Sequence, residues 1–138
     1  MPDLFPEDLE KWHYFESKLT DIFNTVEIRT PLLESTELFS RSVGNSSDIV
    51  NKELYSFLDR NKESVSLRPE GSASVIRAII QKKQENEKHK LWYQGPMFRY
   101  ERPQRGRFRQ FHQIGVEYLG FQEGVSEYEL ISMVLQIN

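Results

Sequence analysis

Two long segments with the composition of β-strands, Leu91–Tyr100 and Arg109–Leu119, constrain the fold of this chain most strongly. The first is rich in aromatic residues and the second carries both aromatic and β-branched residues, and a short loop that carries several arginines joins them. We therefore expect one large hairpin with the arginine-rich loop at its tip. The remaining residues have to be arranged around this hairpin.

Apolar periodicity predicts helices and shorter strands around the hairpin. The expected helices cover residues 6–24, 35 or 36 to 41, 72–83 and 127–137. The expected shorter strands cover residues 26–29, 53–58 and 64–67, the last two as an antiparallel pair joined by a polar turn at 59–63. Pro31 should end the first strand, and Gly44 should end the second helix before a polar loop at 45–48. This order predicts an α+β fold, mainly an antiparallel sheet flanked by helices.

Length and composition exclude several classes of protein. The 138 residues suffice for one globular domain, and nine Phe, six Tyr and two Trp can fill its core. The chain has no cysteine, which excludes disulfides, Fe–S clusters, zinc knuckles and thiol nucleophiles. No apolar run approaches the roughly 20 residues of a membrane span, and the first residues do not form a signal peptide. We therefore expect a cytoplasmic protein with no membrane partner.

Positive charge is concentrated in one short window, although the whole chain has a net charge of −3. Between Met97 and Gln113 the chain carries five arginines against one glutamate. Guanidinium groups on a loop can hold phosphate oxygens through paired hydrogen bonds. We expect the loop at 102–108 to bind a ligand that carries phosphate.

Side-chain alternation sorts the two long strands into chemically different faces. Arg99 and Glu101 share one face of the first strand, and His112 lies on the mostly apolar face of the second. The opposite face of the second strand carries Phe111, Gln113, Gly115 and Glu117. A glycine inside a strand often marks the close approach of a ligand or of backbone, so Gly115 predicts the floor of a site whose walls form hydrogen bonds.

This polar face suits two kinds of ligand. Phe111 offers a flat surface for a base, and Arg99 can neutralise charge that develops at a reacting phosphorus. Glu70, expected beside the N-terminus of the helix at 72–83, and Glu117 both suit an ammonium group. The pattern predicts one ligand with phosphates and a base, and a second ligand with a cationic amine.

A plainer interpretation of the same residues stays open at this point. The hairpin can be exposed, with a polar face wetted by solvent, a bulge at Gly115 and an arginine-rich loop that is solvated or touches RNA. His112 is better explained as a structural histidine than as a catalytic base.

Three segments form a specific combination. They are Leu67-Arg68-Pro69-Glu70-Gly71-Ser72-Ala73, Gly95-Pro96-Met97-Phe98-Arg99-Tyr100-Glu101-Arg102-Pro103-Gln104 and Gly106-Arg107-Phe108-Arg109-Gln110-Phe111-His112-Gln113-Ile114-Gly115-Val116-Glu117. Together they closely resemble the class II histidyl-tRNA synthetases. The resemblance covers residues 1–138 as the N-terminal part of the catalytic core of that family, with motif 1 at about 8–31 and motif 2 at about 91–119. It implies the class II synthetase fold, truncated.

The resemblance implies histidine and ATP as ligands, with Mg²⁺ accompanying ATP and no metal site on the chain itself. For ATP it implies Arg99 on the α-phosphate as the catalytic residue, Glu101 on the adenine amino group, Arg107 on the γ-phosphate and Phe111 stacked on adenine. For histidine it implies Glu70, Ser72 and Gln113 around the amino group and Glu117 on the imidazole. Ser72 stands where the family usually has threonine, a change that keeps the hydroxyl.

Further expectations concern partners and completeness. The resemblance implies a homodimer formed through motif 1, and histidine tRNA as the partner of the full-length protein. The helix at 127–137 lacks a stop signal, and the family's third motif, second histidine-binding segment and anticodon-binding domain lie beyond this sequence. We therefore expect a fragment that does not aminoacylate tRNA by itself.

Two other functions remain as alternatives. One is a catalytically inactive paralogue, such as the regulatory subunit of ATP phosphoribosyltransferase, and the other is an RNA-binding module that uses the basic loop. A regulator does not need the residues that clamp ATP. The presence of Arg99, Glu101, Arg107 and Phe111 together favours the enzyme.

Overall fold

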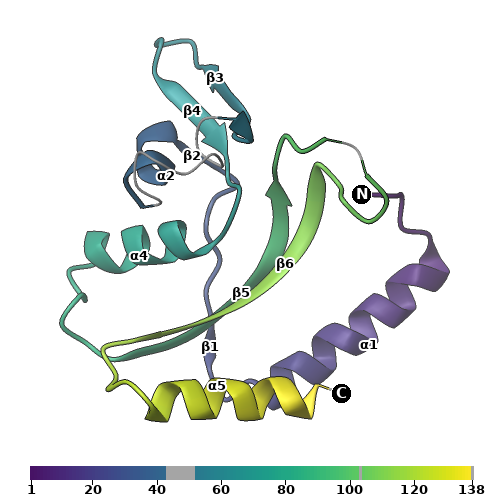
Figure 1. The fold of residues 1–138 in the computed structure, drawn as a ribbon, viewed down its shortest axis with the longest axis vertical. Coiled ribbons are helices and arrows are strands. Elements are labelled where there is room, and N and C mark those ends of the chain that lie inside the picture. Colours follow the sequence, from purple (N-terminus) through teal and green to yellow (C-terminus); the bar gives the residue numbers. More distant parts are fainter. Residues whose placement is uncertain (43–51, 103, 138) are drawn as a thin grey trace. The chain divides into compact units, whose positions relative to one another are not determined.

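The computed structural model describes residues 1–42, 52–102 and 104–137, which divide into two compact units. The first unit contains Met1, Ile28–Glu85 and Tyr93–Gly115, and the second contains Pro2–Glu27, Asn86–Trp92 and Val116–Asn138. Two long strands, β5 (His89–Phe98) and β6 (Gln110–Leu119), are hydrogen-bonded neighbours that contribute to both units (Figure 1). The large predicted hairpin is confirmed, and both strands end within two residues of the expected positions.

A three-stranded sheet lies in the first unit. Its order is β2 (Leu33–Ser35), β4 (Ser64–Leu67) and β3 (Ser56–Leu58), and both pairings are antiparallel. Asp59 accepts hydrogen bonds from the backbone N–H groups of Asn61 and Glu63 at 2.8 and 2.9 Å, which fixes the polar turn between β3 and β4. The predicted antiparallel pair is confirmed. Strand β3 starts three residues after the predicted start at Glu53. The carbonyl of Glu53 accepts a hydrogen bond from Tyr100 N–H at 2.6 Å instead of pairing with β4.

Two helices complete the first unit. They are α2 (Thr36–Ser42) and α4 (Ser72–Gln81), and the core of the unit includes the fully buried side chains of Phe39, Val75 and Met97. Helix α4 ends before residue 83 because Lys83 adopts a left-handed conformation, with φ of 58°, that stops the helical hydrogen-bond pattern. The predicted stop at Gly44 and the loop at 45–48 lie outside the described residues.

The second unit contains α1 (Pro6–Ile22), β1 (Val26–Glu27) and α5 (Val125–Gln136). Strand β1 pairs with β5 in parallel, with Val26 opposite Leu91, and the rings of Phe23 and Trp92 are 5.5 Å apart. The strand is two residues shorter than the predicted 26–29. The chain then reaches Thr30, whose carbonyl and hydroxyl accept hydrogen bonds from Arg68 within the first unit.

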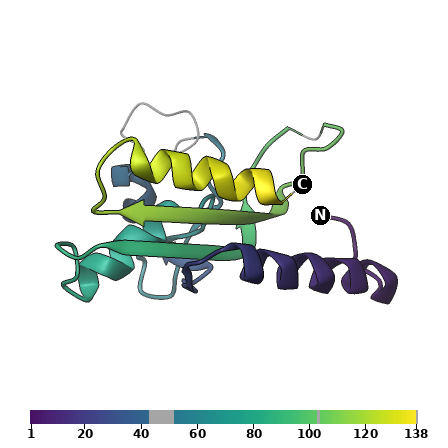
Figure 2. The ribbon, with the colours of Figure 1, turned by 90° about the horizontal axis from the view of Figure 1, so that it is seen from below.

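Helix α5 is tied to the strands of its own unit by one ion pair. The ammonium group of Lys90 on β5 contacts the two carboxylate oxygens of Glu129 at 2.7 and 2.6 Å, and the hydroxyl of Tyr118 on β6 donates to the same carboxylate at 3.0 Å. Figure 2 shows the ribbon of α5 next to the end of β6, which it follows in the chain. The helix begins two residues before the predicted start, because the side chain of Glu127 accepts a hydrogen bond from Gly124 N–H. Across the described ranges, no helix has the length and apolar character needed to cross a bilayer.

Candidate functional site

Arg99 stands directly after the end of β5 and holds together three parts of the first unit. Its Nε donates to the carbonyl of Pro69 at 2.9 Å, and its guanidinium carbon lies 5.2 Å from the centre of the Phe111 ring on β6. Its backbone N–H donates to the carbonyl of Arg109 at 2.9 Å. The guanidinium is therefore fixed against an aromatic face, which is a geometry that arginine prefers to lysine.

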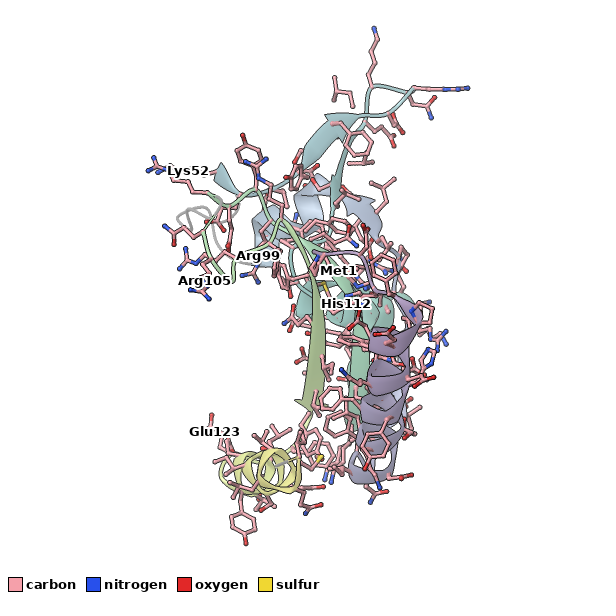
Figure 3. All side chains as sticks on the ribbon, turned by 90° about the vertical axis from the view of Figure 1, so that its right-hand side faces the viewer. Met1, Lys52, Arg99, Arg105, His112 and Glu123 are labelled. Carbon is pink, nitrogen blue, oxygen red and sulfur yellow. The ribbon has the colours of Figure 1, made fainter. Side chains whose placement is uncertain are left out.

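The sorting of residues by face agrees with this arrangement. Arg99 contacts Phe111, as expected for residues on one face, whereas Nδ1 of His112 lies 3.2 Å from the sulfur of Met1. Figure 3 shows Arg99 on one side of the hairpin and His112 with Met1 on the other. The contact of His112 is with a side chain of its own unit, and its structural role stays a prediction.

The loop before α4 places Glu70 at the start of that helix. Both carboxylate oxygens of Glu70 lie 3.2 Å from the backbone N–H of Ala73, so Glu70 accepts hydrogen bonds from the first turn. Ser72 is the first residue of the helix. The predicted position of Glu70 beside a helix N-terminus is confirmed. Arg99 lies close to it in the chain of contacts, because its Nε donates to the carbonyl of Pro69, the residue before Glu70.

Arg68 fixes the other end of this loop, and the sequence analysis did not single it out. It is 4% exposed, and it donates to the carbonyl of Pro96 at 3.0 Å and to the carbonyl and hydroxyl of Thr30 at 3.1 and 3.0 Å. Burial lowers the pKa of the Arg68 guanidinium, while Tyr93 and Glu34 act in the opposite direction. The only signal in the sequence is an arginine between an apolar strand and a proline.

Gly115 lies directly against the ring of Tyr93. A Cβ atom on Gly115 would lie 2.2 Å from Cζ of Tyr93, and a Cβ atom on Gly71 would lie 2.2 Å from Cε2 of the same ring. The close approach expected at Gly115, of a ligand or of backbone, is therefore made by a side chain, and the floor of a binding site at this position stays a prediction. The group that approaches is the buried side chain of Tyr93, and the two glycines leave room for it.

Gln113 offers an unused acceptor on the same strand. Its Oε1 is buried and has no hydrogen-bond partner among the residues that the structure describes. An unsatisfied buried acceptor costs about 1–3 kcal/mol, and a ligand that brings an N–H donor removes this cost. Glu117 lies four residues further along β6 and belongs to the second unit, so its part in the site stays a prediction.

The arginine-rich loop borders a cavity of about 520 Å³ in the first unit. Its lining residues are Lys52, Glu53, Tyr100, Glu101, Arg102, Gln104, Arg107 and Arg109. The predicted pair Glu101 and Arg107 thus face one space, and Figure 3 shows Lys52, Arg99 and Arg105 on one side of this unit. The sequence analysis missed Lys52 and Glu53, because they precede β3 and nothing in their local pattern links them to the loop.

The loop itself is held by short-range contacts. Arg107 N–H donates to the carbonyl of Gln104 at 3.0 Å, which closes a tight turn. The guanidinium of Arg109 lies 4.2 Å from the centre of the Tyr100 ring, and its Nε donates to the carbonyl of Glu101 at 3.2 Å. The cavity therefore combines three guanidinium groups and an ammonium group with two acidic side chains, which suits a phosphate ligand that also carries hydrogen-bond donors.

No group of three or more His, Asp or Glu side chains capable of holding a metal ion occurs within residues 1–42, 52–102 and 104–137. Mg²⁺ commonly binds through substrate phosphates, several waters and one or two carboxylates, and such binding needs no larger cluster. Glu53 and Glu101, which face the cavity beside the arginines, are compatible with this mode.

Comparisons with known proteins agree on one family. The family model described as "Histidyl-tRNA synthetase" matches residues 1–138. The histidine–tRNA ligase of Staphylococcus carnosus (strain TM300) is 49% identical over 141 residues, covering 98% of this chain and 33% of that protein. The same enzyme of Staphylococcus aureus (strain JH9) is also 49% identical, covering 98% of this chain and 34% of that protein. The chain therefore spans about a third of the length of these relatives.

Solved structures give the same result. The apo histidyl-tRNA synthetase of S. aureus is similar with a TM-score of 0.79 and 40% identity, covering 99% of this chain and 32% of that one. A protein from Bacillus halodurans described as an ATP phosphoribosyltransferase regulatory subunit/histidyl-tRNA synthetase has a TM-score of 0.81 and 26% identity, covering 99% of this chain and 35% of that one. These similarities confirm the predicted α+β fold.

Proposed function

This chain belongs to the histidyl-tRNA synthetase family, and on that premise we propose that the product of its full gene activates histidine with ATP and charges histidine tRNA. A carboxylate oxygen of histidine forms a bond to the α-phosphorus of ATP, the bond from that phosphorus to the bridging oxygen breaks, and pyrophosphate leaves. A hydroxyl of the terminal ribose of the tRNA then takes the histidyl group, and AMP leaves. Residues 1–138 supply part of the first site, with motif 1 at about 8–31 and motif 2 at about 91–119.

The observation that carries this proposal is the position of Arg99. It lies on the Phe111 ring and is hydrogen-bonded to the residue that precedes Glu70. One side chain therefore joins the surface proposed for adenine to the loop proposed for the amino acid. A cation at this junction is suited to neutralise charge at the phosphorus that reacts between the two substrates.

The remaining ATP contacts follow from the cavity and the strand. Phe111 stacks on adenine, Glu101 accepts from the adenine amino group, and Arg107 holds the γ-phosphate. The shared lining of Glu101 and Arg107 supports this assignment, because one nucleotide can touch both residues. Mg²⁺ would be held mainly by the phosphates of ATP, where it neutralises their charge.

The amino-acid contacts involve the loop before α4 and strand β6. Glu70, Ser72 and Gln113 bind the amino group of histidine, and Glu117 binds the imidazole. The unpartnered Oε1 of Gln113 supports this assignment, since an ammonium group would supply the donor that it lacks. Glu70 keeps acceptor capacity beside its bonds to Ala73, because an ionised carboxylate offers about four lone-pair sites.

Partners and location follow from the same premise. We propose a homodimer through motif 1, in the cytoplasm, with histidine tRNA as the macromolecular substrate. Apolar side chains exposed on and beside α1 support an interface there: Phe5, Tyr14, Phe15 and Val26.

The test is histidine-dependent exchange of pyrophosphate into ATP by the product of the full gene. We expect exchange that requires histidine and is lost in an Arg99→Gln variant. A regulatory paralogue is the second candidate, favoured by the similarity to the B. halodurans protein, whose description includes an ATP phosphoribosyltransferase regulatory subunit. Absence of exchange in a folded protein that still binds histidine would support the regulator instead.

A further inference from the structure

We infer that Tyr93, a residue outside the proposed contacts, is the positioning residue that sets the distance between the two walls of the amino-acid site. The inference rests on the proposed function and adds a residue to it. Tyr93 is only 3% exposed, and it comes from the middle of β5. It does not contact the proposed substrate itself and affects it only through the start of α4 and through β6, the two elements that it separates.

The two walls meet the Tyr93 ring at their glycines. On one side the ring lies against Gly71, which stands between Glu70 and Ser72 at the start of α4. On the other side it lies against Gly115, two residues after Gln113 on β6. Cβ atoms at both glycines would come within 2.2 Å of the ring, closer than any real contact. The ring therefore fills the whole space between the two backbones.

This contact has a consequence for the ligand groups on either side. The carboxylate of Glu70 is oriented by α4, and the carboxamide of Gln113 is oriented by β6. The Tyr93 ring, which lies between these two elements, therefore sets the distance between the carboxylate of Glu70 and the carboxamide of Gln113. A smaller side chain would let the walls approach or shift, because a packed interior closes only partly around a void. Both groups would then be misplaced for a shared ammonium group.

The unpartnered carboxamide oxygen of Gln113 gives an independent reason to place a ligand beside this ring. It is buried without a partner among the described residues. Such an acceptor is favourable only if a donor arrives from outside the chain. Its position two residues from Gly115 places the amine-binding group next to the part of the strand that Tyr93 supports.

The test compares Tyr93→Leu and Tyr93→Phe with Trp92→Leu in the product of the full gene. Trp92 is the matched control, because it neighbours Tyr93, is 4% exposed and packs on Phe23 in the second unit. For Tyr93→Leu we expect the KM for histidine in pyrophosphate exchange to rise at least tenfold, with the KM for ATP changed less than twofold. Tyr93→Phe should keep the histidine KM within twofold, because it retains the ring. Trp92→Leu should lower the Tm but leave both KM values within twofold.

A second variant covers the case in which Tyr93→Leu does not fold. Gly115→Ala should raise the histidine KM because the added methyl group, which would lie 2.2 Å from Cζ of Tyr93, displaces the ring, and the rise should persist in combination with Tyr93→Phe, which keeps that ring carbon. The inference is overturned if the KM values for histidine and ATP change equally in Tyr93→Leu, or if Trp92→Leu matches its effect on histidine. It is also overturned if Gly115→Ala leaves the histidine KM unchanged. Absence of histidine-dependent exchange in the wild type would instead refute the proposed function, and the inference with it.

Discussion

The guanidinium of Arg99 lies over the ring of Phe111, with 5.2 Å between the guanidinium carbon and the ring centre. The two residues come from opposite ends of the arginine-rich loop, so this contact closes the base of the loop. Because Nε of Arg99 is also bound to the Pro69 carbonyl, the guanidinium has one preferred orientation before any ligand binds. A group oriented in advance costs little reorganisation when charge develops in a reaction.

Arg99→Lys tests whether orientation matters in addition to charge. Lysine keeps the positive charge but has neither the planar face that stacks on Phe111 nor a second nitrogen for Pro69. We expect kcat/KM for histidine-dependent exchange to fall about 100-fold, similar to the removal of one preorganised donor. Arg41→Lys, at an exposed position on α2, is the control and should keep activity within twofold. Full activity in Arg99→Lys would show that charge alone is sufficient.

Arg68→Met tests the buried network below the loop. The substitution leaves the carbonyls of Thr30 and Pro96 and the hydroxyl of Thr30 without their donor. We expect a loss of about 2–4 kcal/mol in the free energy of unfolding, measured by urea denaturation. Arg41→Met removes an exposed arginine and should change this free energy by less than about 0.5 kcal/mol. Equal effects of the two substitutions would exclude a structural role for Arg68.

Tyr118 should ionise late and make stability depend on alkaline pH. Burial, followed by the hydrogen bond to Glu129, raises the pKa of Tyr118 from 10.0 to about 12. A raised pKa means that the folded chain favours the neutral phenol. The contribution of Tyr118 to stability is therefore complete below pH 10 and is lost as the pH rises through about 12.

The measurement is an absorbance titration of the phenols together with Tm values from pH 8 to 11.5. The wild type should show one late phenol that is missing in Tyr118→Phe, and the Tm difference between the two proteins should shrink above pH 10. Glu129→Gln removes the charged acceptor and should move the late ionisation to lower pH. A Tm difference that stays constant up to pH 11.5 would count against the predicted shift.

The parts of the fold that follow from local pattern could be predicted from the sequence. Alternation along β5 and β6 correctly placed Arg99 with Phe111 and separated His112 from them. Helix ends were less exact, because caps such as the side chain of Glu127 and the left-handed Lys83 are set by single residues. Periodicity describes the middle of an element better than its ends.

The contacts that cross between distant elements could not be predicted. Gly115 stood out in the sequence, but the ring that fills its space comes from Tyr93, and nothing in the local pattern pairs the two. Arg68 likewise binds Thr30, far earlier in the chain. Lys52 reaches the cavity from a segment with no basic pattern. Such contacts depend on packing in three dimensions, for which a single sequence gives no periodic signal.

Residues 1–138 alone should not catalyse pyrophosphate exchange. They span about a third of the length of the histidine–tRNA ligases that they match, so they supply only part of the proposed site. At the reacting phosphorus, the proposed site has one arginine from these residues, Arg99. We expect the isolated chain to show no histidine-dependent exchange above an Arg99→Gln control under conditions where the full gene product turns over. Full turnover by the isolated chain would show that these residues contain a complete adenylation site.

The isolated chain should also associate at high concentration through helix α5. Five apolar side chains of this helix are between 60 and 75% exposed, namely Val125, Tyr128, Ile131, Val134 and Leu135. Contiguous apolar surface of this kind favours association, because burying it removes the surface from water. Sedimentation velocity should show a mass that increases with concentration, and Ile131→Glu together with Val134→Lys should remove this increase, leaving only the association proposed through motif 1. The matched control Glu123→Lys changes an exposed charge outside α5 and should leave the association unchanged; a wild-type monomer at all concentrations would refute the prediction.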